Sequence, residues 1–421
     1  MYNVENESEV GVIFEVLNDR GKPLSRLDIV KNFLIYETER ISGDNNACRQ
    51  LTQRINYGWK EILENLSVAD MTDNEAENNF LRMNYVLNFY SEISKIKEKD
   101  GKTISINSQL ADTHKLVKSR FKQIEKKDRN KCYKDLESYV ESLVRMSSRL
   151  RDLRNPFEKI TFQEIPEGSK QQVQSLAAQF LRLKTQSSVL PVLTAIYEVF
   201  FKEAENLVEL MKLCEIAVFR IYYIAGRPSY AGRDKFFALA NNIYRNRTNF
   251  EHAVKNIKEI IEEYSSRDTL KKKLLDKEDF YQWDGLPYFL YELERKRCKE
   301  SGIDKKPNFE WDQMKKWKRE DQIEHILPQK IDEKRKVPYW TERFDTVEHK
   351  KYSKKLGNMT LSYSNQDLGN KGFDKKQPFY KESLWQITKD VAANFTDWTK
   401  EAIEKREREL ITFAEHRWST S

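Results

Sequence analysis

Residues 320–329 read Glu-Asp-Gln-Ile-Glu-His-Ile-Leu-Pro-Gln, residues 356–361 read Leu-Gly-Asn-Met-Thr-Leu, and residues 364–376 read Ser-Asn-Gln-Asp-Leu-Gly-Asn-Lys-Gly-Phe-Asp-Lys-Lys. The first two segments are rich in β-formers and bounded by Pro, Gly or Asn, so they predict short strands at 321–327 and 359–363. The chain has only 5 histidines, and one of them follows a carboxylate in the first strand. These segments therefore predict a small strand-containing module with a chemical role.

The rest of the chain has the pattern of amphipathic helices. From about 47 to 150, apolar residues recur at three- and four-residue spacing. Two helices are expected before this region, at 8–19 and 24–39, with Ser25 as the N-cap of the second. One long helix is expected at 383–417. Helical patterns in the middle of the chain cover 171–185, 188–205, 206–225, 231–247 and 250–264. We therefore expect a mainly α protein whose N-terminal and middle regions are helical and whose C-terminal module holds the two strands.

Composition narrows the class of protein. The 421 residues are 39% hydrophobic and 12% aromatic, which is typical of a globular protein with a sizeable core. No apolar run approaches the roughly 20 residues that span a bilayer, and the first residues lack the apolar stretch of a secretory signal. The 4 cysteines form no Cys-x-x-Cys pair, which excludes a zinc ribbon by spacing. We expect a protein without a membrane span in a reducing, cytoplasmic compartment.

Basic charge is concentrated around the quoted segments. The whole chain has a net charge of +7, and residues 313–381 alone contain 17 Lys and Arg against 10 Asp and Glu. The remainder is therefore neutral on balance. A basic excess at this place favours a phosphate backbone as the partner.

The order of an acid–His pair, an Asn and a second Asn in a basic segment resembles the HNH (His-Me finger) nucleases. This resemblance implies a ββα-metal module, in which a strand ends in the His and a second strand leads into a helix with a further metal ligand. It implies that His325 is the general base, because an imidazole is partly neutral near pH 7. It also implies that Glu324 and an Asn of the following helix bind one Mg²⁺ or Mn²⁺ through oxygen.

Local geometry constrains these roles. Neighbours on a strand point to opposite faces, so Glu324 and His325 can share an ion only if a bulge or a strand end lies at this pair. Asn358 is expected to bond the loop backbone and hold the His in place, as a supporting catalytic residue. For the second metal ligand we favour Asn365 over Asn370. The interval from Asn358 to Asn365 is shorter than the resemblance leads us to expect, and that to Asn370 is longer.

Several basic residues near the motif are candidates for binding the nucleic-acid backbone. Lysines next to the second Asn can reach phosphates on either side of the cut. His349 is equally well explained as a structural or a phosphate-facing residue. The candidates are Lys371, Lys375, Lys376, Lys354, Lys355 and His349.

Two separate stretches resemble the GmrSD-type modification-dependent restriction endonucleases, which join a ParB-like nucleotide-hydrolysing domain to an HNH domain. The first is residues 13–32, Ile-Phe-Glu-Val-Leu-Asn-Asp-Arg-Gly-Lys-Pro-Leu-Ser-Arg-Leu-Asp-Ile-Val-Lys-Asn. The second is the motif set above, with the closing Ile403, Arg406, Leu410 and Trp418. The resemblance implies three domains: a remnant of the ParB-like domain at 1–40, a helical domain at 41–300, and an HNH domain with a closing helix at 301–421.

The resemblance implies a metal-dependent DNA endonuclease of a bacterial restriction or anti-phage system. The family's nucleotide motif, Asp-Gly-Gln-Gln-Arg, is expected upstream of residue 13. We therefore expect that this chain alone does not hydrolyse nucleotides unless another polypeptide, such as a ParB-like partner chain, supplies that part. Three explanations stay open: a fragment of a longer protein, a shortened homologue, or one half of a split system. Because a double-strand cut from one HNH site needs two copies, we also expect a homodimer.

Two alternatives stay open. The chain could be a non-catalytic DNA-binding or regulatory subunit of a split restriction system, which would bind DNA without a metal site. It could also be an HNH-type RNase toxin. Few aromatic residues are interleaved with the lysines, so the stacking contacts typical of single-strand binding are not favoured.

Overall fold

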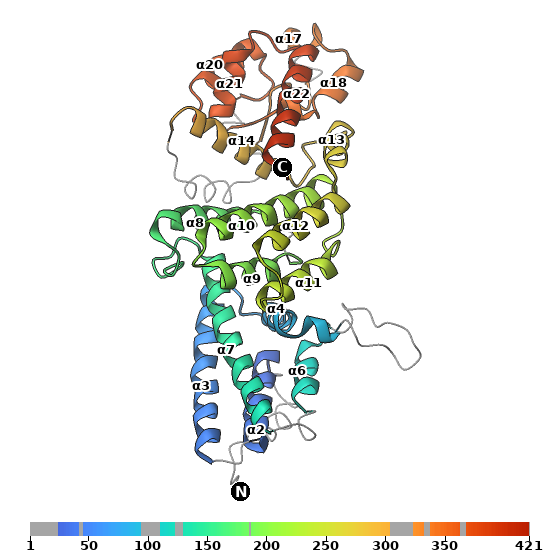
Figure 1. Ribbon diagram of the computed structural model, residues 1–421. Helices are drawn as coiled ribbons and strands as arrows, with labels where there is room; N and C mark the ends of the chain where they lie inside the picture. The colour runs from blue at the N-terminus through green and yellow to red at the C-terminus, as the bar shows by residue number, and fades with distance from the viewer. Residues whose placement is uncertain are drawn as a thin grey trace, which may run out of the picture. The chain divides into compact units, whose positions relative to one another are not determined.

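The computed structural model describes residues 24–41, 45–93, 110–122, 129–184, 187–303, 323–331, 337–362 and 368–420. The helix expected at 8–19 lies outside the described residues. Two compact units are present (Figure 1). The first comprises the described residues up to Glu215 together with Ser229–Ile257, and the second comprises Ile216–Pro228 together with the described residues from Lys258 onward. The domain limit expected near residue 300 falls inside the second unit.

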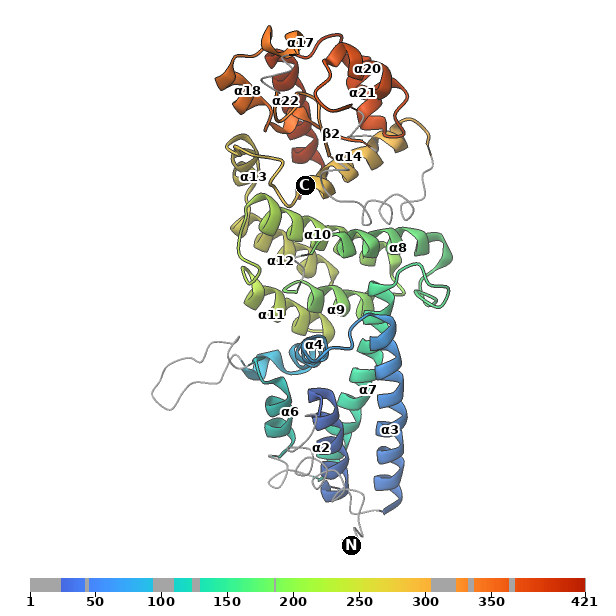
Figure 2. The same cartoon turned by 180° about the vertical axis from the view of Figure 1, so that it is seen from behind.

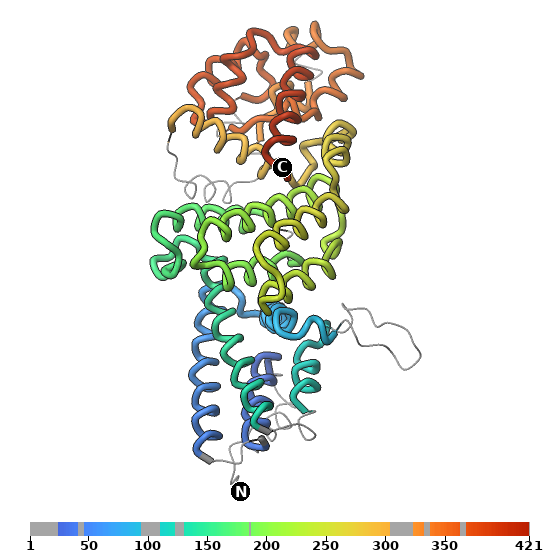
Figure 3. The backbone as a smooth tube through the Cα atoms, in the orientation of Figure 1, coloured from blue at the N-terminus to red at the C-terminus, as the bar shows by residue number. Residues whose placement is uncertain are grey.

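The first unit is helical in its described residues. Its longest helices, α3 and α7, run parallel and side by side (Figures 1 and 3). Tyr133 donates to the carbonyl of Ala47 near their starts, and Arg154 donates to the carbonyl of Ala69 near their ends. The helices that lie in it wholly or in part are α2 (Arg26–Ile41), α3 (Asn45–Val68), α4 (Asn74–Ile93), α6 (Thr113–Lys122), α7 (Arg129–Arg154), α8 (Glu167–Arg182), α9 (Leu190–Phe200), α10 (Ala204–Val218), α11 (Arg233–Tyr244) and α12 (Phe250–Tyr264).

Helix starts in this unit follow local signals in the sequence. The hydroxyl of Ser25 accepts a hydrogen bond from the amide of Asp28 at 3.1 Å, so the N-cap expected for α2 is confirmed. Pro191 lies in the first turn of α9, where its missing amide hydrogen has no cost. The helix expected at 250–264 is α12, with the same bounds.

The second unit contains two short strands, with helices before and after them along the chain. β2 packs against α21, and α21 packs against α14 (Figure 2). Its elements are the π-helix η2 (Phe219–Ile224), α13 (Arg267–Leu275), α14 (Leu286–Glu300), β1 (Ile323–His325), α17 (Pro338–Thr341), α18 (Thr346–Tyr352), the 3₁₀ helix η3 (Leu356–Asn358), β2 (Met359–Leu361), α20 (Phe373–Lys381), α21 (Gln386–Asn394) and α22 (Lys400–Arg417). The described chain is thus mainly helical, as expected.

The single helix expected at 383–417 is wrong, because α21 and α22 are separate. The backbone leaves the helix at Phe395, and the hydroxyl of Thr399 accepts from the amide of Ala402 to start α22. Between them, the carboxylate of Asp397 accepts from the amide of Trp398 at 2.9 Å. The break places Trp398 fully inside the core.

An aromatic core supports the strands. Trp398 stacks on Phe373 at a ring distance of 5.3 Å, and Trp340 belongs to the same buried cluster. Ile326 and Leu327, which follow β1 directly, complete it. Burial of these side chains fixes the segment that carries the candidate histidine.

None of the helices in the described ranges combines the length and apolar character needed to cross a bilayer.

Candidate active site

The two strands form an antiparallel hairpin-like pair at the motif. Ile323 pairs with Leu361, Glu324 with Thr360, and His325 with Met359. Both strands lie where the sequence predicts them, although each has only three residues. β1 ends at His325, but the pairing within it is regular and holds no bulge. The side chains of residues 324 and 325 therefore point to opposite faces of the pair.

Asn358 fastens the loop after β1 to the start of β2. Its side-chain oxygen accepts from the amide of Leu327 at 2.7 Å and from the indole of Trp398 at 3.1 Å. Its side-chain nitrogen donates to the carbonyls of Leu327 and Ser353 at 2.8 and 3.0 Å. The side chain is 0% exposed. The expected bonds from Asn358 to the loop backbone are present, and they hold the residues that follow His325.

The backbone around Asn358 approaches α22 so closely that a glycine is required. A Cβ atom at Gly357 would lie 2.1 Å from the carbonyl oxygen of Ile403. One guanidinium nitrogen of Arg406 donates to the carbonyls of Gly357 and Met359, each at 2.7 Å. η3 and the first residue of β2 are thus fixed from the α22 side.

The ring of His325 is half buried and has two neighbours from other segments. The Tyr281 ring lies 4.5 Å from it, and the side-chain nitrogen of Gln329 lies 3.0 Å from Nε2. An amide nitrogen can only donate, so Nε2 accepts and the ring proton lies on Nδ1. Gln329 is exposed, so a water molecule can take its place at Nε2.

The environment of His325 favours the neutral ring. Burial and the nearby charge of Lys376 lower the pKa of His325 to about 4, while Asp279 opposes this shift. The imidazole is therefore neutral at physiological pH, with a lone pair on Nε2. This is the protonation state that a general base needs.

Glu324 does not share the face of His325. Its carboxylate accepts from Nζ of Lys376 at 2.6 Å and from the hydroxyl of Tyr380 at 2.9 Å, and its residue is only 4% exposed. Burial raises the pKa of Glu324 and lowers that of Lys376, and the contact between the two opposes both shifts. The convergence of Glu324 and His325 expected from the sequence is absent from this arrangement.

Lys376 is corrected from a phosphate contact to a buried structural residue. Its side chain is 0% exposed, and Nζ also donates to the carbonyls of His325 and Ile326 at 3.0 and 3.2 Å. It cannot reach a phosphate from this position. Through these two carbonyls, Lys376 fixes the backbone of the candidate base and of the residue that follows it.

The other basic candidates fall into two groups. Lys354 pairs with Asp279 at 2.8 Å, Lys355 pairs with Glu407 at 3.4 Å, and Nε2 of His349 lies 2.8 Å from the carbonyl oxygen of Pro328. These three contacts are structural. Lys371 and Lys375 are exposed at the start of α20, where a nucleic-acid backbone can reach them.

The predicted metal ligands are not assembled by the described residues. Asn365 lies outside them, and Asn370 is exposed with its backbone carbonyl 3.2 Å from the indole nitrogen of Trp340. Across the described ranges, no group of three or more His, Cys, Asp or Glu is arranged to hold a metal ion. The carboxylate of Glu324 has suitable chemistry, but Lys376 and Tyr380 already occupy it.

Two neighbours of His325 were missed by sequence reasoning. Asp279 and Tyr281 lie in a segment where the helical pattern loosens, more than forty residues before the histidine in the sequence. The amide of Phe280 donates to the carbonyl of Lys354 at 3.0 Å, and this bond docks the segment beside the loop. Burial alone raises the pKa of Asp279, but bonds from Lys354 and from the amide of Gln282 lower it overall. No local motif marks these residues.

A comparison with known protein families finds a match. Residues 264–413 match the C-terminal domain of the GmrSD restriction endonucleases, and this range contains all the residues described at this site. The resemblance to the GmrSD family is thereby confirmed for this part of the chain, and the GmrSD-type region begins before α14. The members of this family are described as restriction endonucleases. A search of curated proteins found no match.

Proposed function

We propose that this protein is a metal-dependent DNA endonuclease of a bacterial restriction or anti-phage system, with an HNH-type site at His325. One observation carries the proposal. A neutral histidine lies at the end of β1, with Nε2 facing an exposed amide that water can replace. The hairpin that holds it is fixed by Asn358 and lies within the GmrSD-type region.

The chemistry assigned to His325 is proton abstraction from water. Nε2 takes one proton, the water oxygen forms a bond to phosphorus, and the bond from phosphorus to the leaving sugar oxygen breaks. The leaving oxygen takes a proton from solvent. Asn358 and Lys376 act as positioning residues, because they hold the backbone at the base and directly after it.

The metal remains part of the proposal through the family resemblance. One Mg²⁺ or Mn²⁺ would neutralise charge on the phosphate and on the leaving oxygen. The predicted pair of Glu324 and His325 does not fit this task, because their side chains lie on opposite faces and Glu324 is paired with Lys376. No step is therefore assigned to a metal held by Glu324.

DNA is proposed to lie along the exposed lysines near α20. Lys371 directly precedes Gly372, the N-cap of this helix, and Lys375 lies in its first turn; neither is buried. The excess of basic residues in this part of the chain supports a phosphate backbone as the partner.

The test is cleavage of a supercoiled plasmid by the purified protein with Mg²⁺ or Mn²⁺, alongside samples with a chelator. Wild type should nick or linearise the plasmid, and His325→Ala should lose at least about a hundredfold in rate, the usual effect of removing a general base. The exposed His252→Ala variant serves as the matched control and should cleave like wild type. If His325→Ala and wild type cleave equally, the assignment fails.

A non-catalytic DNA-binding subunit is the second candidate, and the pairing of Glu324 with Lys376 favours it. A protein of this kind would bind the plasmid without cutting it, with the same affinity in the presence and absence of Mn²⁺. An RNA of matched length, added to both assays, tells whether the nuclease acts on RNA instead of DNA.

A further inference from the structure

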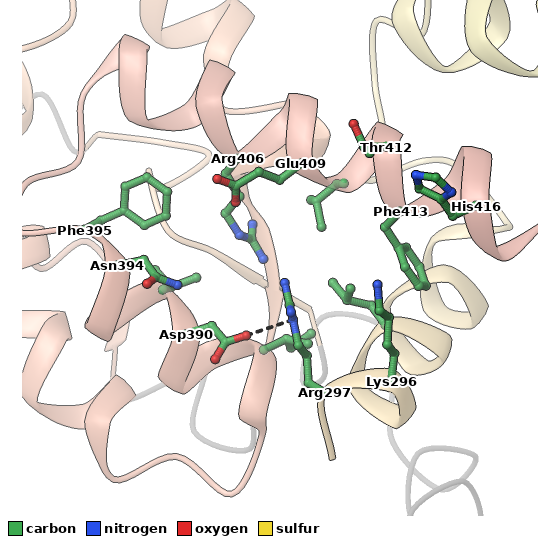
Figure 4. Close-up of a pocket in the computed structure, with 14 residues that line it drawn as sticks. Lys296, Arg297, Asp390, Asn394, Phe395, Arg406, Glu409, Thr412, Phe413 and His416 are labelled. Carbon is green, nitrogen blue, oxygen red and sulfur yellow. Dashed lines mark ion pairs between the residues drawn. The ribbon is translucent and has the colours of Figure 1, made fainter. Parts of the chain in front are cut away.

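A cavity in the second unit lies away from His325, among α14, α21 and α22. Its volume is about 140 Å³, far above the roughly 15 Å³ that a single water molecule needs. Figure 4 shows Arg406 and Arg297 pointing into it from α22 and α14. Asp390 of α21 lies beside Arg297, and their side chains form an ion pair at 3.0 Å. The cavity is therefore lined by two guanidinium groups, of which only Arg297 is paired with Asp390, and Glu409 adds a second carboxylate to the lining.

Arg406 is a buried cation without an acidic partner. It is 5% exposed, and no carboxylate in the described ranges lies within ion-pair distance of it. Burial lowers the pKa of Arg406 to about 10, although Glu409 and Asp390 oppose the shift. A buried charge that lacks a counter-ion is unfavourable, because the group has lost its hydration without gaining a charged partner.

The hydrogen bonds of Arg406 leave part of its guanidinium available to the cavity. Nη1 donates to the two backbone carbonyls beside Asn358, and no bond from its other nitrogens to a described residue is present. Arg297 uses Nε for Asp390 and Nη1 for Glu300. Lys296 lies at the same wall, with Nζ 5.5 Å from the centre of the Phe413 ring, but its charge is paired with Glu300 at 3.7 Å.

We propose that this cavity binds a phosphate-type oxyanion between the guanidinium groups of Arg406 and Arg297. A tetrahedral oxyanion offers several acceptor oxygens, so it can bond the forks of two arginines together. It supplies the counter-ion that Arg406 lacks, while the bonds from Nη1 to the backbone stay in place. Asp390 competes with the ligand for Arg297. This site does not depend on the proposed nuclease activity, since binding alone defines it.

The test is isothermal titration of the intact protein with inorganic phosphate, at an ionic strength held constant with chloride. Wild type should bind one phosphate per chain. Asp390→Asn should bind it several-fold more tightly, because the competing carboxylate is gone. Arg297→Gln should bind it roughly fivefold or more weakly, as expected for the loss of one charged contact. Arg408→Gln, an exposed change on the same helix, should bind like wild type.

The gain expected for Asp390→Asn guards against misfolding as an explanation, because a damaged protein does not bind better. A wild type that gives no binding isotherm, or three variants with the same affinity as wild type, would overturn the proposal. A DNA duplex without terminal phosphates then distinguishes the sources of the oxyanion. If the duplex displaces inorganic phosphate, the ligand is a DNA phosphate; if both bind together, it is a free phosphate compound.

Discussion

Asn358 shows how a residue chosen from sequence acquires its role from packing. All its side-chain hydrogen-bonding groups find partners inside the core, from the loop after β1, the residues before η3 and the indole of Trp398. A buried amide with such a set of partners is costly to remove, because each partner loses its bond. The order of the motif residues predicts the position of this Asn. The sequence gives no signal that Trp398, in the turn before α22, is one of its partners.

Replacing Asn358 with Ala should lower the free energy of unfolding by about 1–3 kcal/mol, the range for groups left buried and unsatisfied. Urea denaturation followed by circular dichroism measures the change. The exposed Asn370→Ala variant is the control and should stay within about 0.5 kcal/mol of wild type. A loss as small as that of the control would mean that these bonds contribute little.

His325 makes stability depend on pH in a defined window. Its pKa is 6.5 in its ordinary state and about 4 in the fold, so between these values the unfolded chain binds more protons than the folded one. Stability is therefore lost as pH falls from 6.5 towards 4. His325→Gln removes this contribution. The difference in free energy of unfolding between wild type and this variant should therefore change by roughly 2 kcal/mol across this pH window.

Urea midpoints of wild type and His325→Gln at pH 7 and pH 4.5 give this difference. Asn370→Ala, which removes no titrating group, should follow the pH dependence of wild type. A difference between wild type and His325→Gln that is the same at both pH values would show that the ring is not kept neutral by the fold.

At the scale of elements, the pair of Glu324 and Lys376 joins β1 to α20. The two residues lie 52 positions apart, and no local pattern connects them. The sequence motif leads us to expect that Glu324 and His325 converge, but alternation along β1 with its regular register places them on opposite faces. The sequence also predicts both strands correctly. It does not predict that α21 and α22 separate, because the signal for the break is the cap at Thr399 within an otherwise continuous apolar pattern.

Lys376→Met should destabilise the protein by about 3–5 kcal/mol, because it leaves the carboxylate of Glu324 buried without its cation. The double variant Glu324→Gln/Lys376→Met should recover most of this loss, since the remaining groups are neutral. A double-mutant cycle from urea denaturation gives the coupling energy. Strictly additive effects would contradict a direct buried pair. Lys375→Met, at the exposed neighbouring position, is the matched control.

At the scale of the whole molecule, charge is uneven along the chain. The net charge of +7 equals the surplus within residues 313–381, and the rest is balanced. Composition alone thus marks the part of the chain that is proposed to face DNA, although it does not separate exposed lysines from buried or paired ones. Lys376 and Lys354 belong to the same basic excess as Lys371, yet their charges are already paired.

DNA affinity should fall as salt rises, with a slope set by the phosphates contacted. In a His325→Ala background that does not cleave, Lys371→Gln together with Lys375→Gln should reduce the slope of log K against log salt by about 2. Fluorescence anisotropy of a labelled duplex at several salt concentrations measures it. Lys60→Gln, an exposed change in the first unit, should leave the slope as it is. An unchanged slope in the double variant would remove these lysines from the DNA surface.

The central claim is that the neutral imidazole of His325 takes the proton from the attacking water. Single-turnover plasmid cleavage by His325→Ala, measured with and without added imidazole, tests it most directly. The account predicts slow cleavage that free imidazole accelerates in the variant but not in wild type. Cleavage by His325→Ala at the rate of wild type, without imidazole, would contradict it.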